Sequence, residues 1–493
     1  MIASEALLGI IGAATVLLVA LAVLVVAARM GHGPLYGGFL GVCGGPRGRR
    51  EAGVVGRGRA WPSRGTPTSR VRVGIGRRIR YDLRMARFST RAILAATRSP
   101  EVNQTPSAIP IYQAAAFSAG DAAELGDVLT GARAGYAYSR IDNPTTSALA
   151  SAIADLEGAE AGLAFATGMA AIHATLVSTV RSGQTIVAAQ AVYGTTRDLM
   201  TRVLAGFGIA TEFVNTTDVA AVGDALARSG APVLYVETIS NPTIVVSDIA
   251  ALAKVAHRHN ALLLVDNTFA SPYACRPIEH GADLVMHSAT KYLSGHADVL
   301  AGVVVGRREL VDSLRPVLVD VGGALAPLAA FLVLRGLPTL SLRMERHSET
   351  AMDLAAWLTG QDGVERVHYP GLPPDPGHEV AVRQLDCFGG MLAFELSGGR
   401  EAGRAFLDAM RISERTASLG AVRTIITHPP STTHRQLDEA ALAASGIAPG
   451  LLRCSVGLED IEDLREDFEL GLAAAVVATK AALAAQAKTT HEK

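Results

Sequence analysis

The chain has 493 residues, of which 49% are hydrophobic and 18% are charged. This composition excludes a disordered protein, and the length suffices for about two to four domain-sized units. The net charge of -1 conceals an asymmetry, because residues 1–84 carry 13 Arg against three acidic residues, a balance of +10, which leaves -11 for residues 85–493.

Residues 6–28 are an apolar stretch of 23 residues without a charge. As a helix they are long enough to cross a bilayer core of about 30 Å, and the arginines that follow would keep the rest of the chain in the cytoplasm. Residues 29–84 are rich in Gly, Arg and Pro, which is typical of a linker. Because the composition changes at Met85, residues 1–84 are interpreted either as an anchor with its linker or as an extension of the gene model.

From about residue 150, alanine-rich stretches that resemble helices alternate with short apolar runs. Such an alternation predicts a mostly parallel sheet covered on both faces. We therefore predict an N-terminal arm over residues 85–140 and an α/β domain over residues 141–336. The predicted strands lie in GLAFATG, TIVAAQAVYG, PVLYVETISNP, ALLLVDNTFA, ADLVMHSATK and AGVVVG.

The pattern changes after about residue 336. A stretch rich in helical patterns is followed by the apolar runs MLAFEL, AVRTIITHP and LLRCSVGLED, and then by a long helical pattern that begins at Ile461. This order of elements predicts a second, smaller α+β domain over residues 337–493.

Lysine is rare in this chain, with five Lys against 40 Arg, yet one lysine follows a predicted strand closely. This residue is Lys291, in SATKYLSGHADVLAG. A desolvated lysine can lose its proton and attack a carbonyl, whereas a guanidinium stays charged. The alternative is a lysine that simply extends its ammonium to solvent from a strand end.

Other polar residues also follow the predicted strands, where ligands of such sheets bind. Together with Lys291 they fit pyridoxal phosphate, which needs a lysine for its aldehyde, an acid for its ring nitrogen and donors for its phosphate. Asp266, 25 residues before Lys291, would keep the ring nitrogen protonated. Gly168, at a strand-to-helix turn, would offer backbone amides to the phosphate. The other members of the set are Met169, Tyr193, Asn241, Ser288 and Thr290.

Two of these residues would contact the cofactor ring, Tyr193 by stacking and Asn241 by a hydrogen bond to the phenolic oxygen. Each residue alone has a simpler interpretation. Asp266 could cap a helix, Gly168 could form a turn, Tyr193 could pack in a core and Asn241 could start an Asn-Pro turn. All of these would have to coincide at successive strand ends, and this favours the cofactor.

The sequence resembles the pyridoxal-phosphate enzymes of Cys/Met metabolism, which comprise cystathionine γ-synthase, cystathionine γ-lyase, methionine γ-lyase and the acylhomoserine sulfhydrylases. The resemblance extends from about Met85 to about residue 480 and implies the aspartate-aminotransferase-like fold (fold type I). It is carried by YSRIDNPT, FATGMAA, VETISNPT, VDNTFASP, SATKYLSGHADVLAG, SLGAVRTIITHPPSTTH and RCSVGLED.

This resemblance implies a role for each matched cofactor residue. Lys291 corresponds to the Schiff-base lysine, Asp266 to the partner of the ring nitrogen and Tyr193 to the stacking ring. The phosphate would be held by Ser288, Thr290 and the backbone amides of Gly168 and Met169.

Further roles follow from the same resemblance. Tyr138 and Arg140 of YSR would reach the phosphate of a neighbouring subunit, so the active unit is expected to be at least a homodimer and, as a further expectation, a homotetramer. Arg453 would bind the substrate carboxylate as a bidentate clamp, and Ser418 would help to position substrate and lysine. Considered alone, Arg453 would be expected to form a surface ion pair with an acid of the following GLED stretch.

Two positions depart from the patterns of individual members. Thr195 stands where methionine γ-lyases carry a cysteine, which argues against that activity. Arg423 stands where synthases and cystathionine lyases often carry an acid, so we expect it to line the substrate pocket and to favour sulfhydrylase-like members. The cystathionine γ-synthase/γ-lyase group is the leading interpretation, with O-acylhomoserine sulfhydrylase and methionine γ-lyase as alternatives.

The reaction implied by the resemblance is γ-elimination or γ-replacement at the Cγ–S bond of sulfur amino acids, with Lys291 as the base for the α-proton. Two other classes remain open. An aminotransferase on the same fold would share Lys291 and Asp266. A membrane-anchored binding protein that has lost catalysis would depend on residues 6–28.

The remaining residues that often mark sites give little sign of metal binding or disulfides. The four cysteines have no CxxC spacing, which fits a reducing compartment, and His428 and His434 lie in a proline-containing loop without further ligands. We expect no metal, a cytoplasmic enzyme for small amino-acid substrates and no nucleic-acid partner. Membrane contact is expected only if residues 6–28 form a helix.

Overall fold

The computed structural model describes residues 104–433 and 446–491, and outside these ranges the residues Arg87, Thr90, Arg435, Asp438, Ala440 and Leu442. The chain divides into two units, and all of the described residues lie within the second, residues 75–493. The apolar segment 6–28 lies outside the described residues. Among the residues that are described, no helix combines the length and apolarity needed to cross a membrane.

The larger of two sheets has seven strands in the order β1-β7-β6-β5-β4-β2-β3. Only β7 runs antiparallel to its neighbours, so the predicted mostly parallel sheet is confirmed. The strands are β1 (Ala161–Phe165), β2 (Thr185–Ala189), β3 (Ala210–Val214), β4 (Val233–Glu237), β5 (Leu262–Asp266), β6 (Leu284–His287) and β7 (Gly302–Gly306).

The centre of this sheet is covered on both faces. Every residue of β4, β6 and β7 is buried. Because successive side chains of a strand point to opposite faces, both faces must be packed against other elements, and this explains the continuous apolar runs in the sequence. The edge strand β3, which was not predicted, has no buried residue. Because β3 mixes polar and apolar residues, it has no continuous apolar run that would have predicted a strand.

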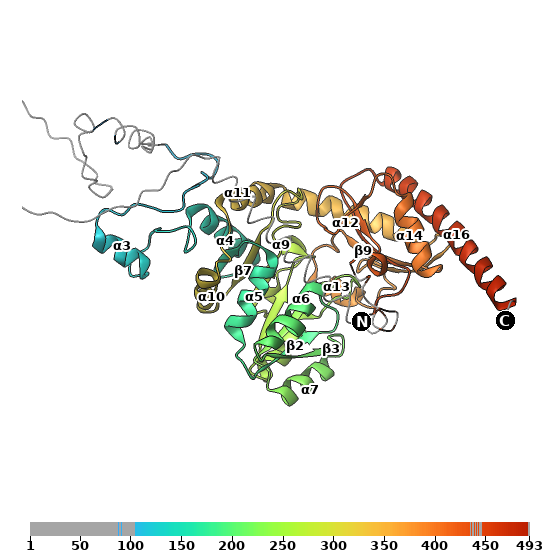
Figure 1. Cartoon of the computed structure of the whole chain (residues 1–493), viewed down its shortest axis with the longest axis horizontal. Helices are drawn as coiled ribbons and strands as arrows, with labels where there is room; N and C mark the ends of the chain where they lie inside the picture. The colour runs from blue at the N-terminus through green and yellow to red at the C-terminus, as the bar shows by residue number, and fades with distance from the viewer. Residues whose placement is uncertain are drawn as a thin grey trace, which may run out of the picture. The chain divides into compact units, whose positions relative to one another are not determined.

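Helices of the large domain connect and cover these strands. They include α4 (Pro144–Glu157), which contacts β1 and β7, and α7 (Val219–Ser229), which packs on β2 and β3 at one edge of the sheet (Figure 1). The others are α5 (Gly168–Thr179), α6 (Gly194–Asp198), the π-helix η2 (Leu199–Leu204), α8 (Ile249–Arg258), α9 (Ser271–Ala274), η3 (Pro277–His280), α10 (Arg308–Val321) and α11 (Pro327–Gly336).

Polar caps fix where several of these helices begin. The side chain of Asn143 accepts a hydrogen bond from the Thr145 amide at the start of α4, and that of Thr167 accepts one from the Ala170 amide at the start of α5. Such caps satisfy amides that have no partner inside the helix. The start of α5 is therefore set at Gly168, directly beyond β1.

The second sheet has five strands in the order β10-β11-β12-β9-β8. Its strands are β8 (Val364–His368), β9 (Met391–Leu396), β10 (Glu414–Arg415), β11 (Ile425–Thr427) and β12 (Leu451–Ser455). The apolar runs that predicted β9, β11 and β12 are confirmed, whereas β8 and the two-residue β10 were not predicted. The order of elements is the predicted smaller α+β arrangement.

Helices pack against this second sheet around its own core. The aromatic rings of Phe394, Phe406 and Phe468 contact one another between β9, α14 and α16. Helices α14 and α16 lie side by side (Figure 1). The helices of this part are η4 (Leu337–Thr339), α12 (Leu340–Leu358), α13 (His378–Gln384), α14 (Gly399–Ala409), η5 (Pro429–Ser431) and α16 (Ile461–His491).

Candidate active site

A cavity of about 250 Å³ lies beyond the carboxyl ends of the central parallel strands. This is where the sequence predicted a ligand. Ten predicted site residues line it, namely Gly168, Met169, Tyr193, Asn241, Asp266, Ser288, Thr290, Lys291, Ser418 and Arg453. The structure thus brings together residues that are up to 285 positions apart in the sequence, as the numbers of Gly168 and Arg453 show.

Lys291 follows β6 in the turn that leads out of the sheet. Its Nζ donates a hydrogen bond to Ser418 Oγ at 3.0 Å. Burial, and after it the positive charge of Arg453, lowers the pKa of Lys291 to about 8. A substantial fraction of the amine is therefore neutral near physiological pH, as a nucleophile or base requires.

Asp266 is the last residue of β5, and its carboxylate faces the cavity. Its Oδ1 accepts a hydrogen bond from the Thr268 amide at 2.9 Å. Burial raises the pKa of Asp266, and the hydrogen bonds from Thr268 and the charge of His287 act in the opposite direction. A cation that enters the cavity would stabilise the ionised form of this carboxylate.

The start of α5 and the turn after β6 form a narrow cradle. A Cβ added to Gly168 would lie 2.8 Å from the Cβ of Ser288, so only glycine allows this approach. A Cβ on Gly302 would lie 2.2 Å from the carbonyl oxygen of Thr167. Free amides at a helix start, beside a serine hydroxyl, are suited to an anion such as a phosphate. A second hydroxyl, that of Thr290, is tied to Ala301 by hydrogen bonds of 3.0 and 3.2 Å.

Arg453 comes from β12 of the second sheet and is 6% exposed. Its Nη1 donates to Asn241 Oδ1 at 3.0 Å and its Nη2 donates to the Ser418 carbonyl at 2.8 Å. Burial lowers the pKa of Arg453 to about 10. Its buried Nε has no hydrogen-bond partner among the described residues. The guanidinium is therefore held rigidly and has donor capacity left for a ligand.

The surface ion pair considered for Arg453 from sequence is not formed. Glu459 accepts hydrogen bonds from the amide and the hydroxyl of Thr424 instead, at 2.6 and 2.8 Å. The alternation of β12 turns Arg453 into the cavity, and the acids lie beyond the strand.

Glu237, which the sequence reasoning missed, also lines the cavity. Its Oε1 accepts the Tyr193 amide at 2.6 Å and its Oε2 accepts the Asn241 amide at 3.0 Å. Glu237 pairs with Asp266 in the register of β4 and β5. Burial, and next the charge of Asp266, raises the pKa of Glu237. The available signal was that Glu237, like Asp266, is the last residue of its strand, whereas the residue that we considered after β4 was Asn241.

Three predicted site residues do not line this cavity within the single chain. Tyr138 and Arg140 are exposed, and the Arg140 guanidinium lies 5.5 Å from the centre of the Tyr138 ring. Arg140 Nη1 donates to the Val319 carbonyl at 2.6 Å. Arg423 is 64% exposed and forms an ion pair with Glu414. The expectation that Arg423 lines the pocket is therefore not met in this arrangement.

No group of three or more His, Cys, Asp or Glu side chains that could hold a metal ion occurs in the part of the chain that the structure describes. His428 Nδ1 and Nε2 lie 2.8 Å from Ser431 Oγ and 2.9 Å from the Pro449 carbonyl. These contacts occupy both ring nitrogens, while His434 lies outside the described residues.

The sequence pattern of one family, described as Cys/Met metabolism PLP-dependent enzyme, matches residues 89–473. The chain belongs to this family. It is therefore a pyridoxal-phosphate-dependent enzyme of sulfur amino-acid metabolism, and the resemblance noted in the sequence is confirmed.

Three similar proteins illustrate the range of the Cys/Met family. L-methionine gamma-lyase of Fusobacterium nucleatum is 44% identical over 74% of this chain and 93% of that protein. O-succinylhomoserine sulfhydrylase of Pseudomonas aeruginosa is 40% identical over 80% of this chain and 98% of that protein. The crystal structure of cystathionine gamma synthase from Xanthomonas oryzae superposes with a TM-score of 0.71 at 39% identity, over 75% of this chain and 94% of that one.

The cavity has the properties that the cofactor of the Cys/Met family requires. It contains an amine of lowered pKa at Lys291, a carboxylate at Asp266, an anion cradle beside Gly168 and an exposed ring at Tyr193. In the same order, these groups suit the aldehyde, the ring nitrogen, the phosphate and the ring face of pyridoxal phosphate. The residues present therefore fit the cofactor.

Proposed function

We propose that this enzyme catalyses γ-elimination or γ-replacement at the Cγ–S or Cγ–O bond of sulfur amino acids and O-acylhomoserines. The observation that carries this proposal is the amine of Lys291, which has a lowered pKa, contacts Ser418 Oγ and lines the same cavity as a buried guanidinium. These properties support a role as proton acceptor. Removal of protons beside a bound carboxylate is what both reactions require.

We infer that four parts of the cavity hold pyridoxal phosphate. Lys291 would bind its aldehyde, Asp266 its ring nitrogen and Tyr193 its ring face. The amides of Gly168 and Met169 would bind the phosphate, together with the hydroxyls of Ser288 and Thr290. When bound, the cofactor supplies an electron sink that stabilises negative charge developed on the substrate carbon.

Lys291 has a second proposed task once the substrate occupies the cofactor. Its free amine would take the proton from the α-carbon, and Ser418 Oγ would orient it by the 3.0 Å hydrogen bond. The charge of Arg453, which helps to lower the pKa of Lys291, keeps the amine able to accept and return a proton near neutral pH.

Arg453 would bind the substrate carboxylate with its unpartnered Nε and its remaining N–H groups. Its hydrogen bonds run to Asn241 on the large domain and to Ser418 on the second. The guanidinium therefore joins the two parts of the site, and it is held in place before the substrate arrives, which limits the ordering needed on binding.

We infer that Tyr138 and Arg140 act across a subunit boundary, so that a homodimer is the minimal active unit. Helix α3 (Ala122–Leu129) of the arm has no buried residue, and Tyr112, Tyr136 and Tyr138 of the arm are all more than a third exposed. Such a run of exposed apolar residues is expected where another subunit covers it. A homotetramer remains part of this proposal.

The cytoplasm is the proposed location of the catalytic part. The cysteines Cys275, Cys387 and Cys454 are free, which suits a reducing compartment. Fractionation of cells that carry the full chain would distinguish the two interpretations of residues 6–28. An anchored enzyme would sediment with membranes and be released by detergent but not by salt.

Elimination and replacement are separated by assays of the full chain with four substrates. These are methionine, cystathionine, and O-acetyl- and O-succinylhomoserine, the last two with cysteine or sulfide. We expect turnover of at least one, either with release of 2-oxobutanoate and no amino acceptor or with formation of a new thioether or thiol amino acid. Product formation that requires a 2-oxo acid acceptor would instead identify an aminotransferase and overturn the proposal.

A further inference from the structure

A buried carboxylate–imidazole pair lies behind the cavity, outside the set of groups assigned above. It joins Glu157, the last residue of α4, to His287, the last residue of β6, with 2.6 Å between Glu157 Oε1 and His287 Nε2. The two side chains are 0% and 1% exposed. Asn267 Nδ2 also donates to Glu157 Oε1, at 2.9 Å, and Asn267 Oδ1 accepts from Thr238 at 2.7 Å.

This pair is a costly way to stabilise a fold. Removal of two ionisable groups from water costs more than their attraction usually returns, and apolar residues of similar size often stabilise as well. Glu157 Oε2 and His287 Nδ1 are buried and have no hydrogen-bond partner among the described residues. Buried polar atoms without partners are rare and call for an explanation, of which a functional one is the most specific.

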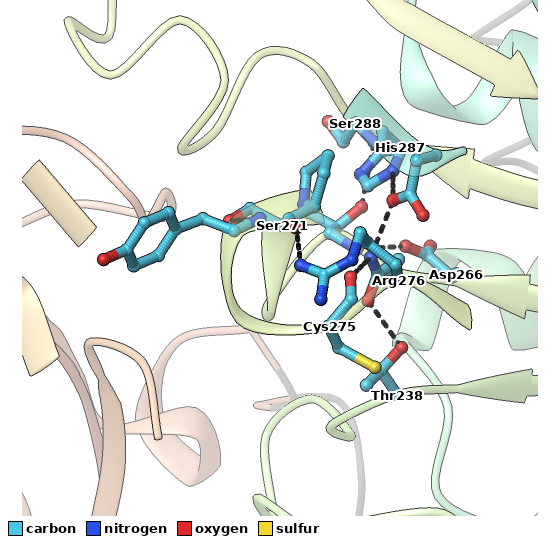
Figure 2. A network of polar contacts seen from close by, with 12 residues as sticks. Thr238, Asp266, Ser271, Cys275, Arg276, His287 and Ser288 are labelled. Atoms are coloured by element: carbon cyan, nitrogen blue, oxygen red, sulfur yellow. Dashed lines mark hydrogen bonds and ion pairs between the residues drawn. The ribbon is translucent and has the colours of Figure 1, made fainter. Parts of the chain in front are cut away.

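The position of the pair relative to Asp266 supplies such an explanation. Strand β6 pairs with β5 so that Asp266 lies opposite Met286, and the Asn267 amide donates to the Met286 carbonyl at 2.9 Å. His287 is therefore one position further along the same sheet edge, and Figure 2 shows it close to Asp266 and Ser288. The alternation of strand side chains turns His287 to the face opposite Asp266. Its influence on Asp266 is thus that of a nearby charge rather than of a hydrogen bond.

We propose that Glu157 and His287 are positioning residues that keep Asp266 ionised, so that the ring nitrogen of pyridoxal phosphate binds in its protonated form. The proposal requires a negative charge on Glu157 and a positive charge on His287, which would favour the negative charge of Asp266 and, through it, the positive charge of the ring nitrogen. This inference rests on the proposed role of Asp266. The positive charge of His287 opposes the rise in the pKa of Asp266 that burial causes, which agrees with this direction.

The test compares two ligands of the cofactor-free full chain. Pyridoxal 5′-phosphate has the ring nitrogen, and 1-deazapyridoxal 5′-phosphate has a carbon in its place but keeps the aldehyde and phosphate. In His287→Gln we expect the Kd of pyridoxal 5′-phosphate to rise about tenfold while that of the deaza compound stays unchanged. Glu157→Gln should act in the same direction, because it removes the counter-charge that favours the imidazolium. Equilibrium dialysis measures both constants.

A matched control is His368→Gln. It removes an imidazole–carboxylate pair of the same 2.6 Å length, with Glu395, in the second sheet. We expect no change in either Kd.

Three outcomes would overturn the proposal. An equal loss of affinity for both ligands would make the pair merely structural, and unchanged affinity for both would make it irrelevant to the ring nitrogen. If His287→Gln does not fold, Glu157→Gln decides between the same outcomes, and if neither variant folds the pair acts in stability.

Asp266→Asn tests the underlying assignment separately. If Asp266→Asn leaves the ratio of the two constants unchanged, the proposed role of Asp266 fails, whatever the pair does.

Discussion

The cavity at the sheet edge and the arm of residues 104–140 differ in how far one chain completes them. At the sheet edge, Lys291, Ser418 and Arg453 already form hydrogen bonds within the chain. On the arm, Tyr138 and Arg140 are exposed and do not line the cavity. The comparison teaches that strand ends of the larger sheet, together with Ser418 and Arg453 of the second part, build the chemical centre within one chain. The arm provides groups whose proposed task depends on assembly.

Lys291→Ala should cause the largest loss. No other lysine lines the cavity in the described residues, so nothing can replace the amine. We expect turnover to fall by at least about 10³-fold, since both the covalent bond to the cofactor and the proton acceptor are lost. Lys291→Arg, which keeps the positive charge, should fail equally. Steady-state assays with the best substrate measure this, and more than a few per cent of wild-type activity in either variant would refute the assignment.

Asp266→Asn tests the sheet edge without removing the amine. An amide has nearly the same shape but cannot balance the charge of a protonated ring nitrogen. We expect kcat to fall about 10²- to 10³-fold with an unchanged melting temperature. Thr268→Ala is a suitable comparison, because it leaves the carboxylate of Asp266 in place, and its effect should be much smaller. Wild-type rates in Asp266→Asn would end the electron-sink assignment.

The sequence predicted those residues of the cavity that lie at the ends of clearly apolar strands, and it missed or could not place the others. Asp266 ends one buried strand and Lys291 follows another, and the apolar runs of both strands are easily identified, so the parallel sheet brought the two residues together as expected. Glu237 was missed because it looked like part of its strand, and β3 was missed because an edge strand needs no continuous apolar run. Arg453 needed the family resemblance, since its strand belongs to the other sheet and no local pattern joins the two.

Two limits of a different kind concern Arg423 and the arm. Arg423 lies close to Ser418 in the sequence, but an ion pair with Glu414 draws it to the surface, and sequence spacing does not reveal such a partner. For Tyr138 and Arg140, the expected partner is another copy of the chain. The local sequence therefore identifies them only through resemblance to relatives.

Mixing two inactive variants tests the arm directly. If Arg140 serves the neighbouring subunit, a dimer of Arg140→Ala with Lys291→Ala contains one site with both groups intact. Equal amounts that exchange subunits freely should regain about a quarter of the wild-type sites, because half of the dimers are hybrids and each has one native site. Activity after mixing, with subunit exchange followed by native mass spectrometry, measures this. Exchange without recovery would place Arg140 outside the partner's site.

The pH dependence of Lys291 provides a smaller effect. Burial, and then Arg453, lowers its pKa from 10.5 to about 8. Because only the neutral amine attacks an aldehyde, capture of 4-nitrobenzaldehyde by the cofactor-free chain should slow about tenfold per pH unit below 8 and level off above it. The rate in Lys291→Ala is subtracted as background. Arg453→Met should move the midpoint upward, since it removes a neighbouring positive charge, and a midpoint near 10.5 in the wild type would contradict the lowered pKa.

Arg423→Glu should have the smallest effect on activity, and it tests whether Arg423 belongs to the substrate pocket. A cation that lined the substrate pocket would repel the second ammonium group of cystathionine, so that its reversal would favour cystathionine over O-acylhomoserine. The side chain is instead 64% exposed and paired with Glu414, and exposed ion pairs contribute little. We therefore expect the ratio of kcat/KM for cystathionine to that for O-acylhomoserine plus sulfide to change less than about twofold. Glu414→Gln, which frees Arg423 without altering it, is the matched control. A large rise of the ratio in Arg423→Glu would show that Arg423 reaches the substrate in the assembled enzyme and would restore its use as a guide to substrate choice.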